Sequence, residues 1–269
     1  MTENKQPQIL LTNDDSIESP GLWAAAEALS ELGYVHVVAP RVQQTSMSRA
    51  LPRESDHIVE ERELTVNGKV WTVYAVGGSP AQAVLHGIMG IMKVEPDLVV
   101  SGINYGENVA SGVTISGTVG AALESASFGI PSLAMSLQTP PSEHFALSDR
   151  VDFSVAAHFT KFFAEKLLQK EMPFDMDLLK VDVPANATPN TPWRVTRQSR
   201  HRYFDVVAKR DPKTGEELFQ YQANIRKELI ERDSDLWAVI LDEVVSVTPI
   251  SLDLTSRIDL GEFRELLED

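Results

Sequence analysis

The chain has 269 residues, of which 43% are hydrophobic, and its formal net charge is −15. This length and apolar content fit one large α/β domain or one domain plus an appendage, and they disfavour two equal independent domains. The negative charge disfavours binding to bulk DNA or RNA, because such binding needs Lys and Arg to neutralise phosphates. Acids such as Glu60, Glu61 and Glu63 are interpreted as solvated surface.

The sequence contains no cysteine, which excludes disulfides, thiolate metal ligands and cysteine nucleophiles. A metal ion therefore has to be held by oxygen or imidazole ligands. No stretch reaches the roughly 18 uninterrupted apolar residues of a membrane-spanning helix, and residues 1–8 lack an apolar signal segment. We expect a soluble, cytoplasmic protein with no membrane partner.

The first predicted element is a short buried strand at residues 9–11, which ends at the polar segment 12–15. A helix follows, with Ser19 as its cap, Pro20 in its first turn and Gly33 at its end. Residues 35–39 predict a second strand. A strand, a helix and a strand within about 30 residues indicate a right-handed crossover with parallel strands.

The alternation continues along the chain. Strands are predicted at residues 70–76, 97–100 and 132–136, and helices begin at Ser79 and Ser116. This pattern predicts a Rossmann-like, doubly wound, mostly parallel sheet with helices on both faces. Ligands of such sheets bind beyond the carboxyl ends of the strands, which is where Asp14, Asp15 and Asn104 fall.

Beyond residue 140 the pattern changes. It predicts a helix at 151–168, strands at 181–183, 194–196 and 244–249, a surface helix after 257, and a projecting hairpin formed by 203–209 and 217–221. We treat residues 1–269 as a single domain with a core at about 8–200. The hairpin arm spans about 201–224, and the closing strand and C-terminal helix span about 234–269.

Four polar segments are candidates for the chemistry. Adjacent carboxylates at a strand end raise the cost of ionising each other unless a cation lies beside them. Mg²⁺ and Mn²⁺ prefer oxygen ligands, which the Asp pair, the hydroxyls of segment 40–52 and the amides of segment 101–108 offer. The helix start at Ser116, Gly117 and Thr118 offers N–H groups and hydroxyls to a phosphate.

Each segment taken singly is more often a turn or a cap than a site. Their functional interpretation rests on their convergence at one edge of a parallel sheet. The six histidines are scattered, and we interpret them as structural or exposed side chains.

The sequence resembles the SurE family of 5′-nucleotidases over nearly its whole length. The resemblance rests on ILLTNDDSIESPGLWAAAEAL (9–29), VVAP (37–40), DLVVSGINYGENV (97–109), SGTVGAALES (116–125) and DEVVSVTPISLDLT (242–255). It implies an α/β metal-dependent phosphatase that acts on nucleoside 5′- and 3′-monophosphates and, in some members, on short polyphosphate. It also implies a homodimer or homotetramer in which the hairpin arm reaches a partner subunit.

The resemblance assigns roles by position. Asp14, Asp15 and Asn104 match the family's metal-binding and catalytic residues, and the fourth ligand, a serine in the family, falls at Thr45. A one-residue shift that uses Ser46 stays open. One divalent ion per subunit, Mg²⁺ or Mn²⁺, is implied, and the phosphate-binding residues are Asn108, Ser116, Gly117 and Thr118.

The sequence departs from the family pattern at Ser16, Arg41, Thr45 and Gln82. These departures keep a second function open, namely a non-catalytic or weakly active homologue that binds nucleotide or metal. For the phosphatase, the nucleophile is a water molecule oriented by the metal or by a carboxylate. Attack by Asp14 itself is the alternative, which the missing D-x-D spacing disfavours. A nicotinamide-dependent dehydrogenase is disfavoured because no G-x-G-x-x-G follows the first strand.

Overall fold

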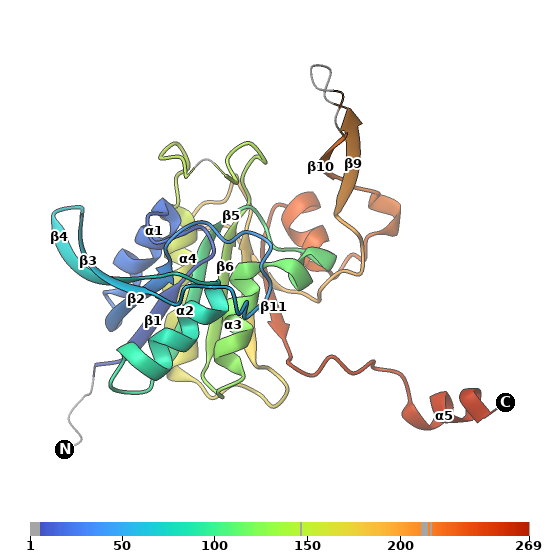
Figure 1. Ribbon diagram of the computed structural model, residues 1–269. Coiled ribbons are helices and arrows are strands. Elements are labelled where there is room, and N and C mark those ends of the chain that lie inside the picture. The colour runs from blue at the N-terminus through green and yellow to red at the C-terminus, as the bar shows by residue number, and fades with distance from the viewer. Residues whose placement is uncertain (1–5, 146, 211–214, 216, 269) are drawn as a thin grey trace.

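The computed structural model describes residues 6–145, 147–210, 215 and 217–268 (Figure 1). Its centre is a nine-stranded sheet with the order β3-β4-β2-β1-β5-β6-β7-β11-β8. The strands in chain order are β1 (Gln8–Thr12), β2 (Tyr34–Pro40), β3 (Val59–Val66), β4 (Lys69–Val76), β5 (Leu98–Tyr105), β6 (Ser132–Leu137), β7 (Leu178–Val183), β8 (Trp193–Val195) and β11 (Val245–Ile250). The six strands from β4 to β7 are parallel, whereas β3 and β11 run antiparallel to their neighbours β4 and β7.

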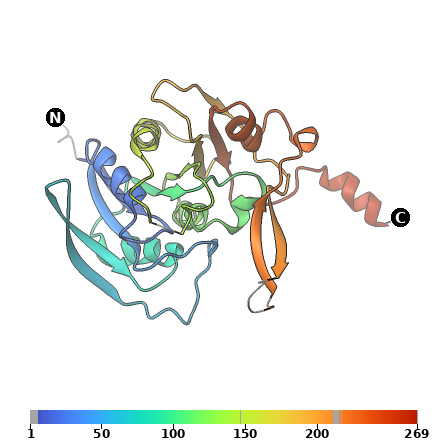
Figure 2. The same ribbon diagram turned by 90° about the horizontal axis from the view of Figure 1, so that it is seen from above.

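Helices cover both faces of this sheet (Figures 1 and 2). On one face α1 (Pro20–Leu29) packs against α4 (Ser154–Gln169), and on the other α2 (Pro80–His86) packs against α3 (Gly117–Ala126). Side chains of one strand alternate between the two layers. Ile9 and Leu11 join the core under α1 and α4, whereas Leu10 joins the core under α2 and α3. The predicted Rossmann-like sheet with helices on both faces is confirmed.

The sequence did not predict strand β3. This strand forms an edge hairpin with β4, and both residues of its turn, Asn67 and Gly68, have positive φ angles of 49° and 79°. Such a turn matches the twist of the two strands. Glu60, Glu61 and Glu63, interpreted as loose surface acids, lie on this edge strand, where charged side chains oppose pairing with another chain.

Two further predictions need correction. The strand expected at 97–100 continues through Asn104 to Tyr105, with a register shift against β6 between Ser101 and Asn104. Asn104 therefore lies within the end of a strand and not in a loop. Ser19 does precede helix α1, but its hydroxyl makes no capping hydrogen bond, whereas the hydroxyl of Ser116 accepts one from Val119 N.

The C-terminal part of the chain carries two projections (Figures 1 and 2). The predicted hairpin is present as β9 (Phe204–Arg210) and β10 (Glu217–Ala223), an antiparallel pair separate from the main sheet. Most of its predicted turn, 211–214, lies outside the described residues. Helix α5 (Leu260–Glu268) stands away from the body and buries none of its described residues. None of the helices in the described part of the chain has the length and apolar character needed to cross a bilayer.

Candidate active site

The carboxyl ends of the central strands open onto a cavity of about 510 Å³. It is lined by segments that are far apart in the sequence, and its walls include six of the predicted site residues: Asp14, Asp15, Thr45, Asn104, Asn108 and Ser116. The other two, Gly117 and Thr118, lie behind Asp14 and contact its carboxylate. The arrangement follows from topology, since β1 pairs with β2 on one side and with β5 on the other, so the strand order changes direction beside Asp14.

Asp14 is buried against the start of helix α3. Its Oδ1 accepts a hydrogen bond of 2.7 Å from the Thr118 hydroxyl. A side chain at Gly117 would displace Asp14, because an added Cβ would lie 2.7 Å from its Oδ2 and 2.8 Å from its Cβ. Burial raises the pKa of Asp14 to about 6, although hydrogen bonds from the Thr118 side chain and from the backbone around it act in the opposite direction.

Asp15 is equally buried, and both of its carboxylate oxygens are held. Oδ2 accepts from the backbone N–H of Tyr105 at 3.1 Å, and Oδ1 accepts from Gln43 Nε2 at 3.0 Å. Burial raises the pKa of Asp15 well above its ordinary value, and the charge of Asp14 raises it further. Two buried carboxylates that disfavour each other's ionisation are an environment that a divalent cation stabilises.

Asn104 and the loop after β2 add neutral oxygens. The Asn104 side-chain nitrogen donates to the carbonyls of Tyr105 (3.2 Å) and Gly106 (2.7 Å), so the oxygen Oδ1 is the atom available to a cation. The loop is tied to the aspartates because Gln44 N donates to Asp14 O at 2.7 Å. This contact brings the exposed side chains of Thr45 and Ser46 to the cavity.

This donor set fits a hard divalent cation. Within the described residues, no three His, Cys, Asp or Glu side chains gather closely enough to hold a metal. A cation at the cavity would therefore depend on two carboxylates supplemented by amide and hydroxyl oxygens. That combination is typical of Mg²⁺ or Mn²⁺ and not of Zn²⁺, which prefers imidazole and thiolate ligands.

Two residues border the place expected for phosphate. Ser116 caps helix α3, and its Oγ accepts from Val119 N at 3.1 Å, which leaves its hydroxyl hydrogen for another acceptor. Asn108 uses one of its two amide hydrogens to reach Ser136 Oγ at 2.9 Å. The second hydrogen remains available to a ligand.

Three residues that depart from the family pattern, Ser16, Arg41 and Gln82, have defined local conformations or contacts. Ser16 adopts a φ of 96°, a conformation that favours glycine, so a backbone cost accompanies the serine. Arg41 donates to Glu60 at 2.7 Å. Gln82 forms a reciprocal capping box with Ser79 at the start of α2. None of these contacts removes an oxygen from the cavity.

Sequence reasoning missed several residues of the cavity wall, namely Glu107, Pro141, His144, Phe145 and Phe204. Glu107 is buried, and its Oε1 accepts from the Tyr203 hydroxyl at 2.5 Å, while burial raises the pKa of its carboxyl. No local sequence pattern predicts a contact between residues that are 96 positions apart. His144, interpreted as structural, packs over Gly106, where an added Cβ would lie 2.6 Å from its Nε2.

The sequence of this chain is similar to those of known proteins. Residues 9–205 match the sequence model of the family described as "Survival protein SurE". The chain belongs to the SurE family. A protein of Archaeoglobus fulgidus named 5′-nucleotidase SurE is 43% identical over 254 residues, which cover 94% of each chain. A protein of the same name from Thermococcus kodakarensis is 38% identical over 97% of this chain and 98% of its own.

The SurE fold extends along the whole chain. The crystal structure of the SurE protein from Aquifex aeolicus aligns with a TM-score of 0.76 at 33% identity, and the alignment covers 98% of this chain and 100% of that one. The family resemblance expected from the motifs at 9–29, 97–109 and 116–125 is thereby confirmed.

Proposed function

We propose that this SurE protein is a 5′-nucleotidase that hydrolyses nucleoside monophosphates to nucleoside and phosphate with one Mg²⁺ or Mn²⁺ per subunit. The observation that carries the proposal is the meeting of two buried carboxylates, Asp14 and Asp15, with Asn104 at one cavity. Relatives that match 94% or more of this chain are named 5′-nucleotidases. The proposal extends to 3′-monophosphates and short polyphosphate.

Asp14, Asp15, Asn104 and the Thr45 hydroxyl would hold the cation, with Ser46 as the alternative hydroxyl. When bound, the cation offsets the negative charge of the carboxylates and of the substrate phosphate. Both oxygens of Asp15 and one of Asp14 already accept hydrogen bonds, which restrains these side chains. A restrained carboxylate is suited to orient a water molecule for in-line attack, and we favour water over Asp14 as the nucleophile.

The substrate phosphate is assigned to Asn108 and Ser116. Asn108 donates its free amide hydrogen, and Ser116 donates its hydroxyl hydrogen. Gly117 and Thr118 support the phosphate site indirectly, because they contact the Asp14 carboxylate on the side away from the cavity. Preorganised donors of this kind stabilise charge that develops on phosphate oxygens.

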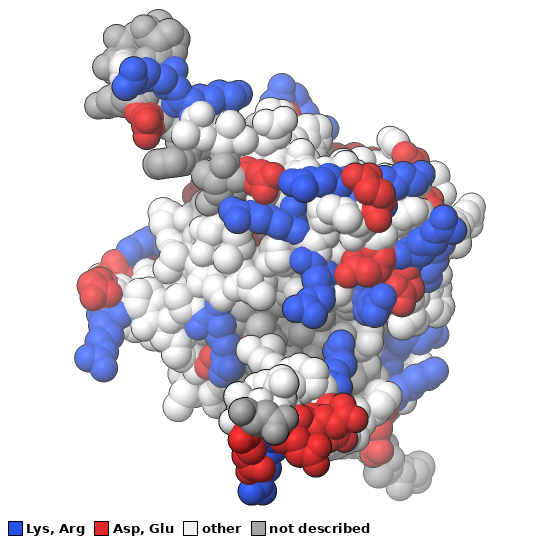
Figure 3. All heavy atoms as spheres, turned by 90° about the vertical axis from the view of Figure 1, so that its right-hand side faces the viewer, with Lys and Arg blue, Asp and Glu red and all other residues white. Residues whose placement is uncertain are grey.

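A small nucleotide suits the shape and the charge of the molecule. The cavity volume of about 510 Å³ lies within the range for small-molecule sites, and Phe145 and Phe204 give one wall an apolar surface. On the face that carries the hairpin arm, basic and acidic side chains are interspersed (Figure 3). Surface charges elsewhere in the described chain are paired, such as Arg194 with Asp242 and Arg197 with Asp233. These features favour a small molecule over bulk nucleic acid.

The proposal also includes the association of subunits. We assign the chain to a single SurE domain that associates as a homodimer or homotetramer through the hairpin arm. The support is the position of β9 and β10, which pair only with each other among the described strands and project from the body (Figure 1). An isolated two-stranded hairpin is marginally stable in water, so packing on a partner would stabilise it.

A mononucleotide panel tests the function. Purified protein is incubated with AMP, GMP, CMP and UMP in Mn²⁺ or Mg²⁺, with and without EDTA, and released phosphate is measured. We expect release that requires the metal. Asp15→Asn should lower kcat/KM by at least about 100-fold, because an amide cannot supply the carboxylate charge. The matched control is Asp97→Asn, just before β5, where among the described residues the carboxylate accepts only from Gln8 N.

Three results would count against the proposal: no phosphate release from any nucleotide, release that persists in EDTA, or an Asp15→Asn variant as active as Asp97→Asn. Nucleotide binding without turnover would instead support the non-catalytic homologue.

A further inference from the structure

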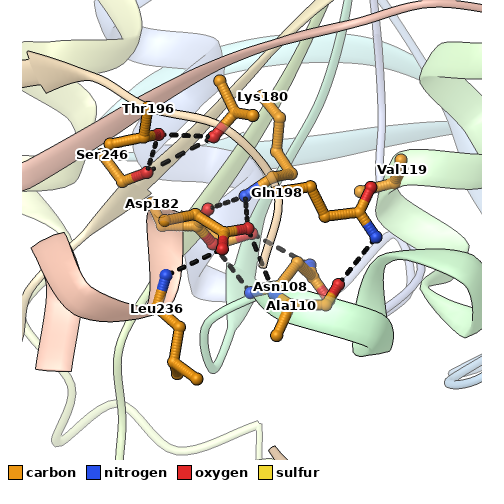
Figure 4. Close-up of polar contacts among 12 residues, drawn as sticks. Asn108, Ala110, Val119, Lys180, Asp182, Thr196, Gln198, Leu236 and Ser246 are labelled. Carbon is orange, nitrogen blue, oxygen red and sulfur yellow. Dashed lines mark hydrogen bonds and ion pairs between the residues drawn. The ribbon is translucent and has the colours of Figure 1, made fainter. Parts of the chain in front are cut away.

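A buried charge cluster lies next to the backbone of Asn108, a residue of the cavity wall (Figure 4). Lys180 and Asp182, on strand β7, and Asp235, before strand β11, are all fully buried. The Lys180 ammonium contacts the Asp182 carboxylate and lies 3.2 Å from Asp235 Oδ2. Charged side chains are rarely buried to this extent unless they are paired, because leaving water costs several kcal/mol per ion.

The carboxylates of this cluster hold the backbone of the loop that carries Asn108. Asp182 Oδ1 accepts from the N–H of Asn108 at 2.7 Å. Asp235 Oδ2 accepts from the N–H of Ala110 at 3.1 Å. Two amides of one loop, two residues apart, are therefore bonded to two carboxylates that share a single ammonium group.

The loop needs this support because its backbone is unusual. Ala110 has a φ of 54°, a left-handed conformation that costs about 1 kcal/mol or more for a residue other than glycine. The side chain of Gln198 also donates to Ala110 O at 2.9 Å, and Asp235 Oδ1 accepts from Ser199 N at 2.9 Å. The cluster and its contacts thus join four separate segments, at 108–110, 180–182, 198–199 and 235, beside the cavity wall that Asn108 lines.

Stability alone does not explain the cluster. A buried ion pair is commonly neutral or unfavourable for stability compared with apolar residues of similar volume. This cluster has two carboxylates for one ammonium, and burial raises the pKa of Asp182 to about 6 despite the neighbouring Lys180. The cluster carries an unbalanced buried charge, and its carboxylates accept hydrogen bonds from two loop amides. We explain it by the backbone conformation of the loop that these hydrogen bonds fix.

We propose that Lys180, Asp182 and Asp235 are positioning residues, which fix the Asn108–Ala110 backbone so that the Asn108 amide is aimed at the substrate phosphate. The inference rests on the proposed function for the role of Asn108 in phosphate binding. Lys180 balances charge in the cluster, Asp182 fixes the position of Asn108, and Asp235 fixes Ala110. A displacement of about 1 Å at such a group can lower a rate about 100-fold.

The variant Asp182→Ala isolates this role. It removes the acceptor of the Asn108 N–H and leaves Lys180 paired one-to-one with Asp235, so no isolated charge is created. The matched control is Val181→Ala on the same strand. Val181 is fully buried but faces the core under α1 and α4, so its truncation destabilises the same strand without touching the loop.

The activity test is a double-mutant cycle with AMP as substrate at saturating Mn²⁺. We expect Asp182→Ala to lower kcat by about 10- to 100-fold, while Val181→Ala stays within about three-fold of wild type despite a lower Tm. Asn108→Ala should abolish the sensitivity to residue 182, so that Asn108→Ala/Asp182→Ala is no slower than Asn108→Ala alone. A double variant slowed by the product of the two single effects, or an Asp182→Ala variant as active as Val181→Ala, overturns the proposal.

Hydrogen exchange tests the same inference without any activity. In the wild-type protein the amides of Asn108 and Ala110 should exchange slowly for a loop, and this measurement needs no variant to fold. Asp182→Ala should accelerate exchange across residues 104–112, whereas Val181→Ala should not. Rapid exchange at both amides in the wild type refutes the positioning role, even if AMP is hydrolysed. Slow exchange in a wild-type protein that hydrolyses no nucleotide rejects the proposed function and leaves the structural contact supported.

Discussion

The hydroxyl of Thr118 donates a 2.7 Å hydrogen bond to Oδ1 of Asp14, and both side chains are buried. This contact joins the first turn of α3 to the segment that follows β1, across 104 positions of sequence. It restrains the Asp14 carboxylate in one orientation and opposes the increase in pKa that burial causes. Groups that orient a metal ligand commonly affect metal affinity nearly as strongly as the ligand itself.

Thr118→Val tests this contact, because valine keeps the shape of threonine and removes the donor. We expect the Mn²⁺ concentration for half-maximal AMP hydrolysis to increase by about 10- to 100-fold at neutral pH. The control is Thr160→Val, since Thr160 is also fully buried but donates only to Ala156 O within α4. Equal metal titrations for the two variants would show that the Thr118 hydroxyl has no part in metal binding.

The choice between Thr45 and Ser46 can be settled by removing each hydroxyl. Both residues line the cavity, but Ser46 has a φ of 65°. The resemblance of the sequence to the family assigns the ligand position to Thr45. We expect Thr45→Ala to raise the Mn²⁺ requirement about 10-fold, Thr45→Ser to preserve or improve it by removing the methyl group, and Ser46→Ala to have little effect. The reverse pattern in the metal titration would assign the ligand to Ser46.

The raised pKa of Asp182 predicts a particular dependence of stability on pH. Its pKa is about 6 in the folded protein and 3.8 as the reference value, so the folded state holds this proton more tightly. The contribution of Asp182 to the free energy of unfolding therefore declines as pH rises from about 4 to about 6. We expect the Tm of wild type minus that of Asp182→Ala to fall over this window, measured by calorimetry. For Val181→Ala we expect the Tm difference from wild type to stay constant over this window. A constant Tm difference for Asp182→Ala would contradict the raised pKa.

The proposed role of the hairpin arm can be tested by deletion. Replacing residues 209–217 with a short glycine turn shortens β9 and β10 but leaves Phe204 at the cavity wall. We expect sedimentation to show a smaller assembly than wild type at the same protein concentration, because contact area on the partner is lost. An unchanged sedimentation coefficient would assign subunit association to another surface.

Strands and helices of the sheet layer were predictable where the pattern of apolar residues along the sequence matches the repeat of the element that they form. The apolar run Ile9 to Leu11 and the small-residue helix after Ser116 have unambiguous patterns, and the structure contains both elements. Strand β3 was missed because its charged residues resemble a surface loop, and only its pairing with β4 makes it a strand. The length of β5 was underestimated because Gly102 and Asn104 are typical of turns.

The cavity was predictable from the chain only in part. Asp14, Asp15 and Asn104 were identified because parallel strands place their carboxyl ends at one edge. The contact of Glu107 with Tyr203 has no local signal, since it depends on the path of the chain between them. Lys180 and Asp182 did leave a signal, as two charges two residues apart in an otherwise apolar strand, and this signal indicates a buried pair on one strand face.

The reversed direction of β11 has a consequence for biosynthesis. Because β11 runs antiparallel to β7, Ser246 pairs with Asp182, and the segment before β11 returns to the edge of the sheet where the strands carry the site. Asp235 reaches the Asn108 loop by this route. A nascent chain emerges from the ribosome with its amino terminus first, so this loop lacks its second carboxylate until β11 has left the exit tunnel. The proposed positioning of Asn108 can therefore be completed only late in translation.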